Sequence, residues 1–141
     1  MNKKPKISIV TISYNSSKTI RDTIDSVVSQ DYENIEYIII DGKSKDDTID
    51  IIKSYGDKIS RLISEEDDGL YDAMNKGIRA ATGDVVGILN ADDLYYTNHL
   101  VSDVAEVFIL NDVDSIYGDL LYVDNIDTDI IRRYWKSGDF N

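Results

Sequence analysis

The sequence has no cysteine, one proline and one histidine. Without cysteine there is no disulfide framework, no thiolate nucleophile and no thiolate metal site, which suits a protein of the reducing cytoplasm. The single histidine, His99, has no second His or Cys with which to share a metal ion. We therefore expect His99 on the surface of a helix, away from any catalytic role.

Basic residues are also scarce. The chain has 15 Lys and Arg residues against 27 Asp and Glu residues, so its formal net charge is −12. A surface of this sign repels phosphate backbones and anionic lipid, which argues against nucleic acid and membrane partners for this segment. An acidic domain that binds an anionic nucleotide needs a metal ion or a few directed donors to offset its own charge.

Long apolar runs are absent as well. The apolar stretch behind the basic start is interrupted by Ser8, Thr11 and Ser13, so it is too short for a signal peptide or a membrane span. There is no Gly-x-Gly-x-x-Gly after the first apolar segment and no Walker-type Gly-Lys-Ser/Thr, which disfavours ordinary dinucleotide and P-loop sites. With 141 residues and no evident linker, we expect one cytoplasmic domain over residues 1–141.

Apolar strands alternate with amphipathic helices along the chain. Apolar and β-branched runs predict strands, and apolar residues at helical spacing predict helices between them. The predicted strands cover residues 6–13, 35–40, 59–64, 85–89, 115–117 and 120–123. The predicted helices begin at caps on Ser16 or Ser17, Asp46 and Thr97, with a further helix over 70–81. This order predicts an α/β fold, a mostly parallel sheet with helices on both faces.

Polar residues follow three of these strands, at the edge where open α/β sheets bind ligands. They are Ser13-Tyr14-Asn15, Asp41-Gly42 and Asn90-Ala91-Asp92-Asp93. Adjacent carboxylates with an amide oxygen nearby suit Mg²⁺ or Mn²⁺. Each group also has a plainer interpretation: Asp92 as the start of the next helix, Asp41 as a turn residue and Tyr14 as a half-buried core aromatic.

Four consecutive acids, residues 65–68, precede Gly69 and the helix predicted over 70–81. A helix dipole favours acids at this end, so Asp67 and Asp68 have a structural explanation. Asn75 and Gly77 are poor helix formers, and we expect both to face the sheet edge. Lys76 either offsets some of the negative charge or is solvated.

Five separated motifs together resemble the family 2 glycosyltransferases. They are Ile9-Val10-Thr11-Ile12-Ser13-Tyr14-Asn15, Ile38-Ile39-Ile40-Asp41-Gly42-Lys43-Ser44, the segment 67–77, Ala81-Thr82-Gly83-Asp84 and Leu89-Asn90-Ala91-Asp92-Asp93. The group of bacterial polysaccharide and colanic-acid-type gene products is the most similar. The resemblance covers about residues 6–122 and implies the GT-A fold, a Rossmann-like sheet that binds a nucleotide-diphosphate sugar and a divalent cation, Mn²⁺ or Mg²⁺.

The resemblance also implies site residues. Thr11, Ser13 and Tyr14 would line the nucleoside pocket, and Asp41 would contact the base. Asp92 would be the main metal ligand, with Asp93 beside it, and the metal would act as a Lewis acid on the diphosphate. The nucleotide-sugar site as a whole would comprise Thr11, Ser13, Tyr14, Asn15, Asp41, Asp67, Gly69, Asp72, Asn75, Asn90, Ala91 and Asp92.

Three positions depart from the family pattern. Asn90 replaces the first acid of the Asp-x-Asp motif, Gly42 replaces the second acid after strand two, and Met74 replaces an Arg before the helix Asn. Inverting members use a carboxylate as general base, and no acid here matches that motif. We therefore expect the base beyond Asn141 and the fold to be incomplete at its C-terminus.

The resemblance implies an inverting glycosyltransferase that acts in cell-surface polysaccharide synthesis. Its donor would be a UDP-sugar, the usual donor of the family, and its acceptor a saccharide or a lipid-linked acceptor. Peripheral membrane association would belong only to the full-length protein. One alternative is a non-catalytic nucleotide-binding or regulatory domain of the same fold. Another is a phosphoacceptor receiver domain, which would need an acidic pair where Ser13-Tyr14-Asn15 stands.

Overall fold

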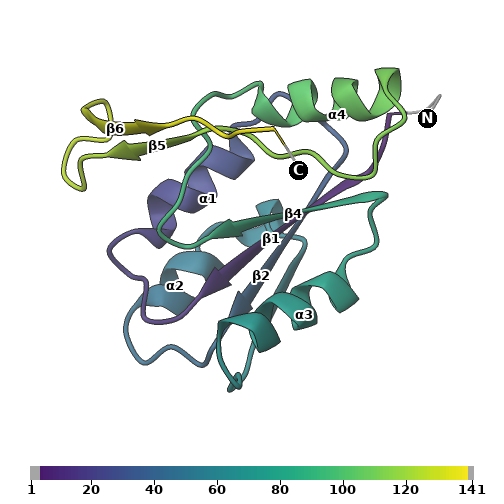
Figure 1. Ribbon diagram of the computed structural model, residues 1–141. Coiled ribbons are helices and arrows are strands. Elements are labelled where there is room, and N and C mark those ends of the chain that lie inside the picture. The colour runs from purple at the N-terminus through teal and green to yellow at the C-terminus, as the bar shows by residue number, and fades with distance from the viewer. Residues whose placement is uncertain (1–3, 140–141) are drawn as a thin grey trace. The chain divides into compact units, whose positions relative to one another are not determined.

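The computed structural model describes residues 4–139, which form two compact units, one ending at Asn111 and the other beginning at Asp112 (Figure 1). The single domain expected over residues 1–141 stays a prediction. The elements of the first unit are β1 (Ile7–Ser13), α1 (Ile20–Val28), β2 (Ile35–Asp41), α2 (Thr48–Lys53), the 3₁₀ turn η1 (Gly56–Lys58), β3 (Arg61–Ser64), α3 (Leu70–Ala80), β4 (Val85–Asn90) and α4 (Leu100–Leu110). The second unit holds β5 (Leu120–Val123) and β6 (Ile131–Trp135).

The first unit is built on a four-stranded sheet of order β3-β2-β1-β4, in which every neighbouring pair is parallel. The predicted α/β fold class is therefore confirmed. Ser13 pairs with Asp41, Asp41 pairs with Ser64, and Ile12 pairs with Asn90. Because the strands are parallel and in this register, all four carboxyl ends meet at one edge of the sheet.

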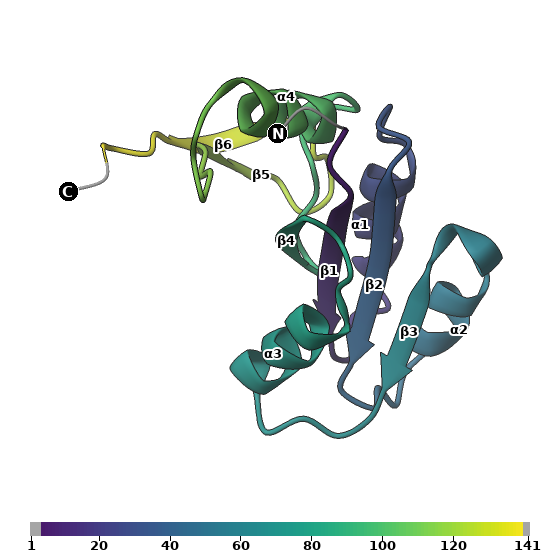
Figure 2. The same ribbon diagram turned by 90° about the vertical axis from the view of Figure 1, so that its right-hand side faces the viewer.

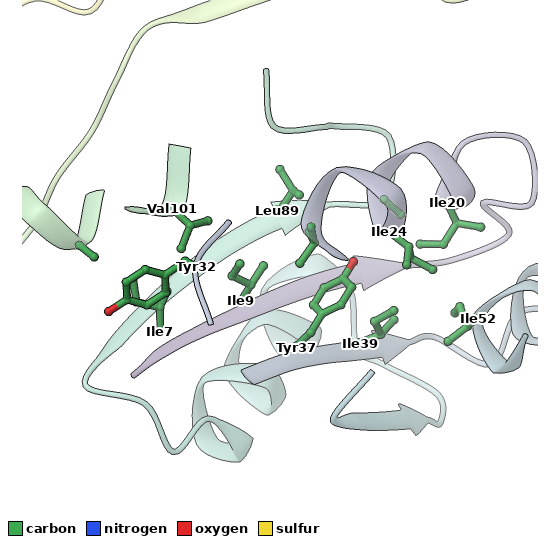
Figure 3. Close-up of a cluster of buried hydrophobic side chains, with 13 residues drawn as sticks. Ile7, Ile9, Ile20, Ile24, Tyr32, Tyr37, Ile39, Ile52, Leu89 and Val101 are labelled. Atoms are coloured by element: carbon green, nitrogen blue, oxygen red, sulfur yellow. The ribbon is translucent and has the colours of Figure 1, made fainter. Parts of the chain in front are cut away.

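One face of the sheet is covered by α1, α2 and α4, whose apolar side chains join those of the strands in one cluster (Figure 3). Ile20 and Ile24 of α1 are fully buried there against Ile9 and Ile39. Burial of one such side chain contributes about 1.5–3 kcal/mol, so this layer supplies much of the stability that holds the strands in register.

Within the first unit, α3 lies on the other face (Figure 2) and packs on β1 and β2 through Ala73 and Gly77. A β-carbon on Gly77 would lie 2.2 Å from Cγ1 of Val10, so the glycine lets the helix approach the sheet closely. The expected inward position of Gly77 is confirmed, whereas that of Asn75 is wrong because Asn75 is exposed. Ile78 of the same helix is 47% exposed.

The Thr82-Gly83 segment is fastened to the opposite edge of the sheet, where β1 and β2 begin. The carboxylate of Glu36 accepts hydrogen bonds from Ser8 Oγ (2.5 Å), Thr82 N (2.8 Å) and Lys6 Nζ (3.2 Å). A β-carbon on Gly83 would lie 2.7 Å from the Lys6 carbonyl oxygen and 2.8 Å from the Ser8 nitrogen. This motif is thus explained by packing and lies far from the carboxyl edge.

The predicted elements differ from the structure at two helix caps and at two strands. No side-chain hydrogen bond caps α1 or α4, so neither the serines before α1 nor Thr97 acts as predicted. Asp46 does accept a hydrogen bond from the Thr48 backbone N–H at 3.1 Å, at the start of α2. In the second unit, residues 115–117 are not a strand, and β5 pairs antiparallel with β6, a strand that the sequence did not indicate.

Among residues 4–139, no helix is both long and apolar enough to cross a membrane.

Candidate donor-binding site

The carboxylate of Asp41 lies at the centre of the carboxyl edge and is fully buried. Its Oδ1 accepts hydrogen bonds from the hydroxyls of Ser13 (2.9 Å) and Ser44 (2.5 Å), and its Oδ2 accepts from the Ser44 backbone N–H (2.8 Å) and the Ser64 hydroxyl (2.9 Å). These donors come from the ends of β1, β2 and β3, so Asp41 ties three strands together. The hydrogen bond from the Ser44 N–H to Asp41 confirms the interpretation of Asp41 as a turn residue. Its contact with the base of a nucleotide stays a prediction.

Two of these hydrogen-bond donors, Ser44 and Ser64, could not be predicted from the sequence pattern. Ser44 lies three residues after Asp41, a spacing that permits a local side-chain turn, but serine is common in loops. Ser64 becomes a partner only through the β2–β3 register, which a single sequence does not specify.

The loop after β1 presents Tyr14 to solvent. Its side chain is 60% exposed, so the interpretation as a half-buried core residue is wrong. Asn15 has a positive φ of 46° and joins two loops, because its N–H donates to Ser44 Oγ (2.8 Å) and its Oδ1 accepts from the Lys45 N–H (2.8 Å). Asn15 therefore fixes the backbone of the loop that carries Tyr14 to the loop after β2.

Thr11, a predicted pocket residue, lies in the interior of β1 and not at its carboxyl end. It is fully buried, and its hydroxyl lies 3.0 Å from the hydroxyl of Tyr37. Because Tyr37 belongs to the core beneath α1, Thr11 packs on that side of the sheet and has no surface to offer a ligand.

Lys76, a residue of α3, contacts several of the acidic residues that lie before the helix and in its first turn. Its Nζ lies 2.6 Å from Asp67 Oδ1, 3.1 Å from Glu65 Oε1 and 3.3 Å from Asp72 Oδ2, and it donates to the Glu66 carbonyl oxygen at 2.8 Å. The hydrogen bond to Asp67 raises the pKa of Lys76 well above its ordinary value. The prediction that Lys76 offsets the local negative charge is confirmed.

The start of α3 is set by Gly69 and Asp72. Gly69 has a φ of 103°, a conformation that favours glycine, and Asp72 accepts a hydrogen bond from the Asp68 N–H at 3.0 Å. That hydrogen bond and Lys76 lower the pKa of Asp72. Among the described residues, the side chain of Asn75 has no hydrogen-bond partner, and it is exposed.

The segment Asn90–Asp93 continues directly from β4. The Ala91 N–H donates to the Ile12 carbonyl oxygen at 3.1 Å, and the Asp93 N–H donates to the Asn90 carbonyl oxygen at 3.0 Å, so the turn is fixed to the sheet. Asp92 and Asp93 are both exposed. Since α4 begins only at Leu100, the interpretation of Asp92 as the start of that helix is wrong.

The chemistry of this segment fits a divalent cation. Although Asp93 is an exposed residue, partial desolvation of its carboxyl group raises its pKa, the neighbouring charge of Asp92 raises the pKa further, and the Asn90 side chain opposes the rise. The Asn90 Oδ1 atom is buried without a hydrogen-bond partner among the described residues. Two adjacent carboxylates and an amide oxygen are ligands that Mg²⁺ and Mn²⁺ accept. In residues 4–139 no group of three or more His, Cys, Asp or Glu forms a complete site, so most of the coordination would come from water and substrate.

His99 lies at the exposed start of α4, with its Nδ1 2.7 Å from Asp103 Oδ2. Its predicted surface position is confirmed.

The sequence model described as Glycosyl transferase family 2 matches residues 8–140, nearly the whole chain. The chain belongs to glycosyl transferase family 2. An uncharacterized glycosyltransferase of Rickettsia felis is 38% identical over 126 residues, which cover 85% of this chain and 20% of that protein.

Two solved structures show the same fold. TarS of S. aureus, residues 1–349, in complex with UDP-GlcNAc superposes with a TM-score of 0.68 at 25% identity, covering 73% of this chain and 31% of that one. The mannosyltransferase PcManGT from Pyrobaculum calidifontis, in complex with GDP-Man and Mn²⁺, has a TM-score of 0.67 at 25% identity, covering 83% of this chain and 35% of that one. The first unit therefore has the GT-A fold, and the chain spans a fifth to about a third of the length of these proteins.

Proposed function

We propose that this chain forms the donor-binding part of a metal-assisted, inverting glycosyltransferase. Its donor would be a nucleotide-diphosphate sugar, UDP-linked by preference, and its acceptor a saccharide or lipid-linked saccharide of a bacterial cell-surface polysaccharide. The observation that carries the proposal is the carboxyl edge of a family 2 sheet, where Tyr14, Asp67 and the Asp92–Asp93 pair are presented together. Structural relatives in complex with UDP-GlcNAc and with GDP-Man and Mn²⁺ support it.

In this proposal the residues at the carboxyl edge contact different parts of the donor. The exposed ring of Tyr14 packs on the nucleobase, since an aromatic face held by a fixed loop costs little entropy to bring into contact. Asp92 and Asp93 hold the divalent cation, and Asn90 borders it. When bound, the cation neutralises charge that develops on the leaving diphosphate. Ser13, Asn15 and Asp41 keep the loops in the geometry that these contacts require.

The α3 side supplies the border of the ribose and diphosphate. Gly69 and Asp72 shape the entry to the helix, and Asn75 has a free amide that a donor group can reach. Ala91 is buried, so it contributes through its backbone position between Asn90 and Asp92. Thr11 has a structural part, because its hydroxyl is used within the core.

Calorimetric titration of UDP, UDP-sugars, GDP and GDP-sugars, with Mn²⁺ and with EDTA, tests the proposal. We expect binding that requires Mn²⁺ and that weakens at least about tenfold in Asp92→Ala, because one ligand-bearing carboxylate is lost. Asp22→Ala is the matched control, since it removes an exposed carboxylate from the first turn of α1 and should bind as wild type does.

Binding that is equally tight in EDTA and in Asp92→Ala would contradict the metal assignment. No binding of any nucleotide diphosphate by folded wild-type protein would contradict the donor site itself and favour the alternative, a domain of this fold without the chemistry.

A further inference from the structure

The strand β3 ends the four-stranded sheet on one side (Figure 2). Within residues 4–139 it pairs only with β2, so its other side has no strand partner. An edge of this kind presents unpaired backbone N–H and C=O groups to whatever lies beside it. The sheet can therefore be extended at β3 by a further strand.

The register with β2 determines which backbone groups of β3 are free. The Glu65 N–H donates to the Asp41 carbonyl oxygen at 3.0 Å, so the backbone of Glu65 faces β2. Successive residues of an extended strand direct their backbone groups to opposite sides, so Ile63 also faces β2, whereas Leu62 and Ser64 face outward. Leu62 and Ser64 thus each offer one N–H and one C=O at the free side.

The side chains of β3 alternate between the two faces of the sheet. Leu62 packs in the cluster beneath α1 and α2, whereas Ile63 packs in the cluster beneath α3. Arg61 and Glu65 lie two residues from Ile63 in either direction, so they share its face. These three residues border a groove of about 250 Å³ between β3 and α3, which is lined by Arg61, Ile63, Glu65, Lys76, Arg79 and Ala80.

The stretch carries charges of both signs, placed symmetrically about Ile63. Arg61 is exposed, and among residues 4–139 it has no ion pair. Glu65 lies 3.1 Å from Lys76 Nζ, but its side chain is still 57% exposed. Edge strands are commonly protected by charge, and charge of one sign would repel a second copy of the strand. An Arg and a Glu at equal distances from a central residue make the strand complementary to itself instead.

We propose that β3 pairs antiparallel with β3 of a second copy of this chain, about a two-fold axis at Ile63. In this register Leu62 faces Ser64 of the second copy, and the two residues exchange both backbone hydrogen bonds. All the free backbone groups of β3 are then used. Because the axis makes the contact reciprocal, Arg61 faces Glu65 of the second copy, and Glu65 faces Arg61. An axis at Leu62 or Ser64 would place Ile63 opposite Arg61 or Glu65 and would leave the charges unmatched.

The strand pair is small, which sets the expected strength of the dimer. Four residues from each copy bury far less than the roughly 1,200–2,000 Å² of a stable interface, so we expect weak, reversible association that grows with protein concentration. Antiparallel pairing directs the carboxyl edges of the two sheets in opposite directions, so each copy keeps its own donor-binding edge. The inference therefore does not depend on the proposed function.

Exchange of charge tests the pairing, by sedimentation equilibrium over a range of protein concentrations. Arg61→Glu and Glu65→Arg should each weaken self-association about tenfold or more, because like charges then face each other twice in the dimer. Mixed in equal amounts, the two variants should associate about as well as wild type, since opposite charges meet again in the mixed dimer. Arg21→Glu is the matched control, because it makes the same change on the exposed surface of α1 and should associate as wild type does.

A disulfide tests the register, because the chain has no cysteine of its own. Opposite residues that do not hydrogen-bond to each other have Cα atoms about 4.5 Å apart, a distance that a disulfide spans. Ile63→Cys should therefore form a covalent dimer on mild oxidation, seen by non-reducing electrophoresis. Leu62→Cys is the control. Its counterpart would lie two residues further along the strand, about 7–8 Å away, so it should stay uncrosslinked.

Wild type that stays monomeric at every concentration would overturn the inference and leave the edge to solvent or to a strand of another protein. Self-association that is equal in wild type and Arg61→Glu would overturn it as well, because the contact would then lie elsewhere on the chain. A dimer in which Ile63→Cys does not cross-link would contradict the register. Circular dichroism checks the folding of each variant; if Glu65→Arg does not fold, Arg61→Glu and the Ile63→Cys disulfide decide.

Discussion

Replacement of Gly77 by alanine should destabilise the first unit, although alanine is the better helix former. The new β-carbon would lie 2.2 Å from Cγ1 of Val10 and 3.3 Å from its Cβ and Cγ2. An ordinary carbon–carbon contact is about 3.5–4.0 Å, so α3 would have to retreat by roughly 1.3 Å or more. Val10 cannot yield, because it is fully buried and β-branched.

Two opposing effects set the size of the change. Overpacking a core costs about 1–3 kcal/mol, and a contact this short places Gly77→Ala at the upper end. The gain in helix propensity from Gly to Ala is about 1 kcal/mol. We therefore expect the free energy of unfolding to fall by about 2 kcal/mol, measured by urea denaturation followed by far-UV circular dichroism.

A double-mutant cycle with Val10→Ala identifies the contact responsible. Val10→Ala alone should cost about 2 kcal/mol, from two lost methyl groups and the space they leave. In the double variant the new methyl group occupies that space, so the two costs should fall short of additivity by at least about 1 kcal/mol. Gly87→Ala is the control, since its β-carbon would lie an ordinary 3.7 Å from the Tyr95 hydroxyl. Wild-type stability in Gly77→Ala, or full additivity in the cycle, would refute the reasoning.

Two further predictions concern buried carboxylates. Burial alone raises the pKa of Glu36, but hydrogen bonds from Ser8, Thr82 and Lys6 outweigh it and lower the pKa to about 2. Glu36 thus stabilises the fold above about pH 4.5, by up to about 3 kcal/mol, and the advantage of wild type over Glu36→Gln should shrink as the pH of denaturation falls from 4.5 toward 2. A difference that does not change with pH would contradict this. Asp41→Asn should lower the free energy of unfolding by about 1–3 kcal/mol, because an amide N–H would then face a donor in the buried cage, and unchanged denaturation would contradict the cage.

The sequence predicted the architecture because the two central parallel strands, β1 and β2, are buried on both faces over most of their length. Every residue of β1 is buried, and such a strand must be continuously apolar or β-branched, so composition alone reveals it. The turn residues at the ends of β1, β2 and β4 then mark the carboxyl edge. The second unit lacked this signal. Every residue of β6 is exposed, so hydrophobic burial left no pattern from which Ile131–Trp135 could be recognised.

The site was harder to predict than the fold because its residues gain their roles from register. Motif spacing brought Asp41, Asp67 and Asp92 to one edge, but could not tell which carboxylate is already satisfied. Ser64 reaches Asp41 only through pairing of β2 with β3, and Lys76 reaches Asp67 only because the loop folds back over α3. These two contacts are determined by strand register and tertiary packing, which the pattern of residues along the sequence does not specify.

The same contacts show how a chain of net charge −12 can present a donor site. Asp41 is compensated by hydroxyl and backbone N–H dipoles, and Asp67 by the ammonium of Lys76. Asp92 and Asp93 have no cationic partner in the described part of the chain, and partial desolvation of the Asp93 carboxyl group together with the charge of Asp92 raises the pKa of Asp93. Glu65, Asp67 and Asp72 instead share the single ammonium of Lys76, and Glu66 pairs with Lys43. In the proposed function a divalent cation would gain most at the Asp92–Asp93 pair, and once bound it would reverse the sign of the charge that an incoming diphosphate meets.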